Sequence, residues 1–221
     1  KDYNLKIKYN LEKEEYMLKI FSFTLLIISF VLISCAKKDD DSSSSTTTYA
    51  SSASGATASG SITLGNYSIS GTYASACFSA SDSSAPTDAT HIGFVAVVTG
   101  NDNYTLETNY YKDSTCTADT LSLGSYSNMD NVTDQGPTAS DSTANEKVTY
   151  VLRDLSFMAK STAADTFVTN LWSTYSLDFE VDVLKVLSSG NPYYNLIKVT
   201  GTGGDVYFGE ADSSAYPSTV G

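Results

Sequence analysis

The chain has 221 residues, of which 41% are hydrophobic, and it carries a formal net charge of −12. This length and composition suit one folded domain with a sizeable core. From position 35 onward it holds 8 Lys and Arg residues against 21 Asp and Glu residues. So acidic a surface repels phosphate backbones, which excludes nucleic acid as an expected partner.

The first expected elements form a leader. Residues 1–16 are a charged segment without a core pattern, and we interpret them as an upstream extension before a start at Met17. Residues 17–34 pass from Lys19 into an apolar stretch, Ile20 to Ile33, which is too short for a convincing membrane-spanning helix. This layout predicts a secretory signal peptide.

The last four residues of this pattern, Leu32-Ile33-Ser34-Cys35, resemble the lipobox of bacterial lipoprotein signal peptides. The resemblance implies cleavage between Ser34 and Cys35 and acylation of the Cys35 thiol. Several acyl chains hold a protein durably on a membrane. The expected partner is therefore the membrane, and Ala36 after the cysteine favours the outer membrane of a bacterial envelope. An ordinary signal peptide with a chance cysteine, or an uncleaved anchor, is the alternative.

Residues 35–62 are almost wholly small or hydroxylated after a short charged run. Such a segment buries too little apolar surface to offset its ordering entropy. We expect a disordered, flexible tether between the lipid and a folded domain over residues 63–221.

That domain is rich in β-forming residues, with turn residues every ten or so positions, which is typical of an all-β sandwich or barrel. Turns are expected at Gly100 to Asn103 and Thr202 to Asp205. The expected strands are 67–78, 90–99, 103–111, 119–127, 147–158, 175–187, 193–200 and 204–210. The pattern predicts an eight-stranded antiparallel barrel.

Three further features complete the expected fold. Leu177, Phe179, Val181 and Val183 alternate with acidic residues, which indicates a half-buried strand with a bulge or an end at Val183-Leu184. Asn128 to Glu146 is polar and is expected to be one long loop. Asp165 to Trp172 is expected to be a short helix capped by Asp165.

Cys77 and Cys116 remain once Cys35 is assigned to lipid. In an exported chain such a pair is most simply a disulfide. Zinc binding by cysteine would need further closely spaced ligands, which are absent. We therefore predict a disulfide and no metal site.

Four short segments carry a resemblance: Gly71 to Cys77, Tyr111 to Thr117, Trp172, and Val206-Tyr207-Phe208-Gly209. Together they resemble a group of uncharacterised bacterial lipoproteins that are similar to lipocalin-like barrels, although Tyr73 stands where lipocalins carry tryptophan. The resemblance implies a lipocalin-like fold and transfers no catalytic residue.

The sequence offers no catalytic constellation. His91 is the only histidine, and no nucleophile motif accompanies it. Gly201 to Gly204 leads into a strand, not a helix, and is interpreted as a turn. The loop with Asp130, Asp134 and Asp141 lacks the ligand order of a calcium loop, and the side chains of Asp178, Glu180 and Asp182 are expected on a wet face. We expect no cofactor and no enzyme.

Two functions stay open. The barrel could bind a small apolar ligand inside, since eight strands leave room for side chains or for one small molecule. Alternatively, a solid barrel could serve as a structural or adhesin-like interaction lipoprotein that meets a surface partner through its loops. The two differ in whether the interior is hollow or filled.

Overall fold

The computed structural model describes residues 36–37, 47–80, 84–138, 146–200, 204–209 and 211–217, the first pair by backbone only. The predicted extension, the signal peptide, Ser34 and Cys35 lie outside the described residues. The elements are β1 (Ala36–Lys37), β2 (Ile62–Leu64), β3 (Tyr67–Ile69), β4 (Thr72–Ala74), β5 (Phe78–Ser79), β6 (His91–Val98), β7 (Tyr104–Tyr111), η1 (Ala118–Thr120), β8 (Leu121–Pro137), β9 (Glu146–Ala159), α2 (Thr162–Leu171), η2 (Ser173–Tyr175), β10 (Leu184–Val199) and β11 (Val206–Phe208).

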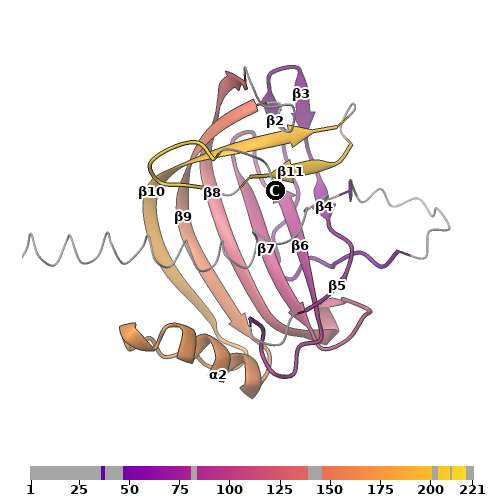
Figure 1. Ribbon diagram of the computed structural model, residues 1–221, viewed down its shortest axis with the longest axis vertical. Helices are drawn as coiled ribbons and strands as arrows, with labels where there is room; N and C mark the ends of the chain where they lie inside the picture. The colour runs from indigo at the N-terminus through magenta and orange to yellow at the C-terminus, as the bar shows by residue number, and fades with distance from the viewer. Residues whose placement is uncertain are drawn as a thin grey trace, which may run out of the picture.

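The main sheet is an antiparallel meander in which β4, β6, β7, β8, β9, β10 and β11 pair in that order. β1 pairs with β4, β5 pairs with β6, and β2 and β3 form a separate hairpin. Figure 1 shows the sheet curling so far that the end of β10 crosses in front of β6 and β7, which gives a nearly closed barrel. The predicted all-β, antiparallel barrel with one short helix is confirmed.

Alternation along the strands builds the core inside this curve. On β6, Ile92, Phe94, Ala96 and Val98 point into the main core, while Val95 and Val97 join a smaller cluster on the other side of the sheet. Both sets are buried. The side chains on the outer face of β6 are therefore buried by another segment of the chain. In antiparallel sheets this outer face is commonly exposed to solvent.

That cover is residues 47–61, which we call the strap. It crosses the outside of the barrel, and Ala50 is only 1% exposed. Backbone hydrogen bonds join Ala50 N to Ser75 O at 3.0 Å and Ser59 N to Val98 O at 2.9 Å. Gly93 allows the close approach, because a Cβ there would overlap that of Ala50. The prediction of a flexible tether is thus wrong for the strap, whose small residues pack tightly where bulky ones could not.

A buried carboxylate fixes the strap. Glu107 on β7 is fully buried and accepts hydrogen bonds from Ser52 Oγ at 2.6 Å, Ala53 N at 2.8 Å and Ser54 Oγ at 2.5 Å. Asn109 Nδ2 donates a fourth bond at 2.8 Å. Four donors replace the water that a carboxylate loses on burial, so this charge is compatible with the interior.

Two predicted loop and strand boundaries are wrong. The polar stretch expected as a loop from Asn128 continues β8 to Pro137, because its backbone pairs with β9 as far as Pro137 opposite Glu146. Gln135 Nε2 also donates to Thr149 Oγ1 at 3.2 Å across this hairpin. The strand expected over 175–187 starts only at Leu184 and then runs unbroken to Val199. The alternating residues before it form a loop, from which Phe179 packs between Phe157 and the helix.

The predicted helix exists but begins earlier. Its N-cap is Ser161, whose hydroxyl accepts from Ala164 N at 3.0 Å, so the predicted cap at Asp165 is wrong and Asp165 lies in the first turn. The turn expected after β6 is confirmed by a bond from Thr99 N to Asn103 O. The β10–β11 hairpin is confirmed by Thr200 N to Asp205 O, while residues 201–203 at its tip lie outside the described residues.

Candidate binding site

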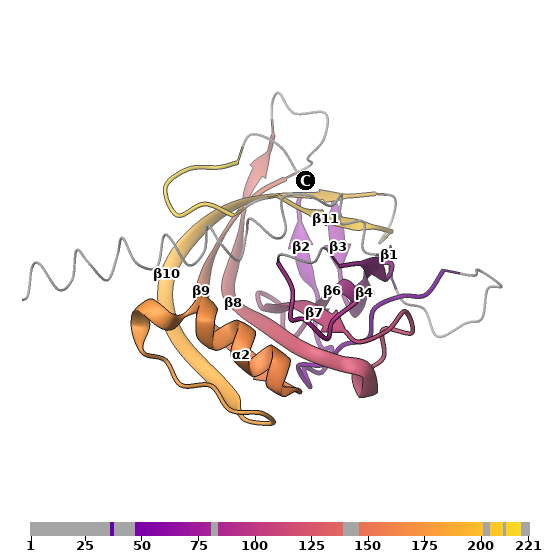
Figure 2. The same cartoon turned by 60° about the horizontal axis from the view of Figure 1, so that its bottom comes forward.

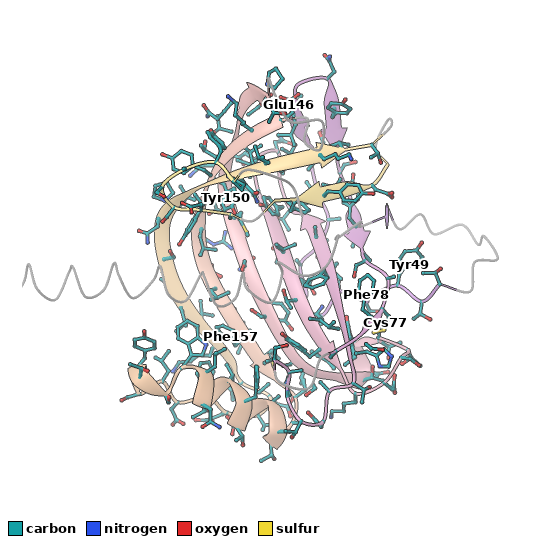
Figure 3. All side chains as sticks on the ribbon, viewed as in Figure 1. Tyr49, Cys77, Phe78, Glu146, Tyr150 and Phe157 are labelled. Atoms are coloured by element: carbon teal, nitrogen blue, oxygen red, sulfur yellow. A yellow bond between two sulfur atoms is a disulfide. The ribbon has the colours of Figure 1, made fainter. Side chains whose placement is uncertain are left out.

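The predicted disulfide is confirmed. Cys77 and Cys116 are bonded, and their Cα atoms lie 6.2 Å apart. The bridge lies beside the start of the strap, because Cys77 N donates to Thr48 O and Ser51 N donates to Cys116 O. Figure 3 shows Cys77 and Tyr49 together on this flank of the barrel. The bridge therefore braces the strands on which the strap rests.

The other residues that the sequence offered as catalytic or metal-binding candidates lie in separate parts of the structure. His91 begins β6, with its Nδ1 2.9 Å from Thr90 Oγ1. Glu180 and Asp182 lie in the loop before β10, where Asp182 forms an ion pair with Lys160 at 2.8 Å. Within the described ranges, no three His, Cys, Asp or Glu side chains are grouped so that they could hold a metal ion.

The acidic residues considered for calcium have protein partners instead. Asp130 on β8 pairs with Arg153 at 3.1 Å, and Asp134 accepts from Gly65 N and Gly136 N, each at 2.7 Å. Asp141 lies outside the described residues. Asp130 thus joins β8 to β9 within one hairpin, and Asp134 joins the turn of the β2–β3 hairpin to β8.

A chain of aromatic rings crosses the barrel interior near the turn between β6 and β7, where Tyr104 begins β7. Tyr193 stacks on Tyr150 at 6.2 Å between ring centroids, Tyr150 meets Tyr104 edge-on at 6.0 Å, and Tyr104 stacks on Phe208 at 5.5 Å. This chain of rings joins β10, β9, β7 and β11 (Tyr150 is labelled in Figure 3). The rings fill the space between these strands, as interlocking side chains do in small barrels.

Two phenols of this core lack good hydrogen-bond geometry. Burial raises the pKa of Tyr104 far above its usual value, and the neighbouring Tyr150 hydroxyl adds to that rise. Burial likewise raises the pKa of Tyr110. Neither hydroxyl oxygen makes a geometrically sound hydrogen bond within the described residues. Both phenols stay neutral at physiological pH.

Figures 1 and 2 show α2 lying across one end of the barrel. A pocket opens beside this helix. Its volume is about 290 Å³, and it is lined by Thr87, Thr162, Ala163, Thr166, Phe167 and Asn170. Thr162, Thr166 and Asn170 are one helical turn apart and share a face of α2. Their side chains and that of Thr87 are exposed, whereas Ala163 and Phe167 are half-buried. The pocket thus has an apolar floor and a polar rim.

The buried hydroxyl of Ser122 contacts a residue in each of the two segments that form the walls of this pocket. Ser122 on β8 is fully buried; its Oγ donates to Asp88 at 2.6 Å and lies 3.3 Å from Ser161 Oγ. Asp88 adjoins Thr87 on one wall, and Ser161 is the cap that begins the helix on the other. This hydrogen-bonded chain sets the width of the pocket in advance of any ligand.

The floor is equally fixed. Phe167 packs against the main core, and its ring centroid lies 6.4 Å from that of Tyr110. Behind the helix, Val168 and Trp172 pack with Leu155 and Phe157 in a separate cluster. Trp172 and Phe157 meet edge-on at 5.5 Å (Phe157 is labelled in Figure 3). The helix is therefore clamped on the side away from the pocket.

The sequence does not reveal this pocket. Phe167 lies within the predicted helix from Asp165 to Trp172, but no pattern singles out Thr87 or Ser122. The one available signal was the spacing of Thr162, Thr166 and Asn170, which lines up three polar groups on a helix. The wall opposite comes from a loop some 75 positions earlier, a juxtaposition that only the fold creates.

The fold and these features define an antiparallel, disulfide-bonded barrel protein with a helix across one end. No known family model matches the chain, and no curated protein matches its sequence. Among the described helices, none combines the length and the apolar character needed to traverse a bilayer.

Proposed function

We propose that the protein is a lipoprotein of the bacterial cell envelope, made with the signal peptide 17–34 and anchored by acyl groups on Cys35. The lipobox-like residues before that cysteine support this assignment. The Cys77–Cys116 bridge supports it independently, since such bonds persist in oxidising compartments outside the cytoplasm. The predicted location is the outer membrane.

For the barrel we propose the role of a solid scaffold that recognises its partner at the surface. The observation that carries this choice is the chain of touching rings from Tyr193 to Phe208. An apolar ligand inside would have to displace these rings, and each lost aromatic contact costs about 1 kcal/mol beyond its buried area.

The second candidate is a carrier with its ligand inside the barrel. The poorly hydrogen-bonded hydroxyls of Tyr104 and Tyr110 favour it, because a buried polar group that lacks a good partner costs about 1–3 kcal/mol. A mostly apolar ligand with one or two acceptor atoms would satisfy them.

The anchor is tested by expressing the full chain in a bacterium and measuring the mass of the mature amino terminus. We expect a diacylglyceryl group on residue 35 and partition into the detergent phase. A Cys35→Ser variant should lose both the lipid and the partition while keeping the barrel. An intact leader, or an unmodified Cys35 in the wild-type chain, would refute the assignment.

Scaffold and carrier are separated by titrating the purified chain with a hydrophobic fluorophore. The scaffold predicts a weak signal that does not saturate. Saturable binding that is weakened at least fivefold in Tyr110→Phe would favour the carrier, since that substitution removes only the hydroxyl.

A further inference from the structure

The pocket between α2 and the loop before β6 has a composition that limits what it can hold. None of its six lining residues is charged, although the chain as a whole carries a net charge of −12. Its volume of about 290 Å³ lies just below the range for ligand pockets, roughly 300–1,000 Å³. A neutral ligand of about one ring fits both facts.

The arrangement of polar and apolar groups narrows the class further. Three threonine hydroxyls and the Asn170 amide supply both donors and acceptors around the rim. Phe167 adds a half-buried aromatic ring to the lining. A ligand that matches has hydroxyl groups around its edge and C–H groups on one face, which describes a sugar ring in its ordinary chair form.

We propose that this pocket is a binding site for a single neutral sugar ring, either free or at the end of a glycan. The ring would lie on Phe167 and Ala163, with its hydroxyls on Thr87, Thr166 and Asn170. Since Ser122 already fixes both walls, binding would spend little free energy on ordering the protein. The site goes beyond the proposed envelope location and does not require the lipid anchor.

The test is a titration of the ¹⁵N-labelled full chain, held in a detergent without a sugar headgroup, with glucose and with N-acetylglucosamine. We expect saturable shifts of the Ala163, Thr166 and Asn170 amide signals, with affinities in the millimolar range that suits few hydrogen bonds. Glucuronate should bind more weakly, because the acidic chain repels an anion.

Two substitutions make the test specific. Asn170→Ala removes one rim group from an exposed helix position without harming the helix, and it should weaken sugar binding about fivefold, the value of one net hydrogen bond. Asn66→Ala, in the β2–β3 turn at the other end of the barrel, is the matched control and should bind as the wild type does.

The absence of saturable shifts with both neutral sugars would overturn the proposal, as would unchanged affinity in Asn170→Ala and Thr166→Ala. Glucuronate binding as tightly as glucose would overturn the neutral class. These outcomes are independent of the mass of the amino terminus, so a failure of this site is distinguishable from a failure of the anchor.

Discussion

At the scale of single residues, Glu107 shows how one buried charge can organise a polar segment. Three of its four hydrogen bonds come from the strap, from Ser52 Oγ, Ala53 N and Ser54 Oγ, and the fourth comes from Asn109 on the same strand. Tyr111 and Tyr126 enclose the same spot, donating to Ser51 O at 2.7 Å and to Ala53 O at 3.1 Å. Burial raises the pKa of both phenols, and the nearby carboxylate contributes to that rise.

Removing this carboxylate should release the strap. We expect Glu107→Ala to lower the free energy of unfolding by about 2 kcal/mol or more, because several buried donors lose their acceptor. The substitution should increase the rate of amide hydrogen exchange at Ala53 by a larger factor than the rates in β9, because Ala53 N loses its acceptor. Glu180→Ala, an exposed carboxylate in the loop before β10, is the control and should change neither quantity. Equal exchange rates at Ala53 in the wild type and in Glu107→Ala would contradict this role.

At the scale of elements, the helix depends on its first turn. Ser161 caps α2 through Ala164 N and also lies within hydrogen-bonding distance of Ser122, so one hydroxyl both starts the helix and joins it to the sheet. Asp165 in the same turn adds negative charge near the positive end of the helix dipole. The pocket wall carried by α2 therefore depends on this cap.

Ser161→Ala should destabilise the protein by about 1 kcal/mol, the usual cost of losing an N-cap. Ser161→Asp keeps an acceptor at the same place and should recover most of that loss in urea denaturation. If alanine and aspartate were equally stable, the cap would contribute nothing and the start of the helix would have to be fixed by Val168 and Trp172 alone.

The same scale explains what sequence could foresee of the fold. β6 and β7 were predictable because an apolar run in β6 and a run of β-forming Tyr and Thr residues in β7 are separated by the turn residues Gly100 to Asn103. The alternation from Leu177 to Val183 was misleading, since period two also arises by chance in a short loop whose Phe179 happens to be buried. The predicted length of β8 was too short, because its second half is polar. That half pairs with β9 through backbone hydrogen bonds, which a pattern of side chains does not reveal.

The candidate site was much less predictable. The disulfide could be predicted because two cysteines remained once Cys35 was assigned to lipid. The pocket beside α2 could not, because it depends on Thr87 lying against a helix far along the chain. The strap was mistaken for a tether because its composition resembles disorder. Only the buried acceptor Glu107, placed by the register of β7, turns those serines into partners.

At the scale of the whole molecule, the described residues leave the first half of β10 as an edge that no further strand pairs with. Within the described residues, β11 covers β10 only at Ile197–Val199, and a bridge to Asp212 covers Tyr194. Among the described residues, the first half of β10 has β9 on one side and no strand on the other. Leu184 and Val186 in this half are 47% and 49% exposed, and Val183 directly before it is 49% exposed. Such an apolar open edge favours association between chains.

Val186→Lys should therefore reduce self-association at high concentration, measured by light scattering, with little change in unfolding free energy. Ser188→Lys places the same charge on an exposed position of the same strand and is the control. The two substitutions lower the net negative charge by the same amount, but only Val186→Lys removes an apolar side chain. An equal effect of both substitutions would assign the change to charge.

The contact of β1 with β4 has a consequence for how the molecule would stand on a bilayer. Ala36 is registered opposite Ala74, and neighbouring Cα atoms along a chain are about 3.8 Å apart. A glyceride on the preceding residue would therefore enter the lipid beside the rim of the sheet. Under the proposed anchoring, the barrel would rest directly on the headgroups through its β4 flank, with no stalk to raise it, and partners would have access only from the remaining sides.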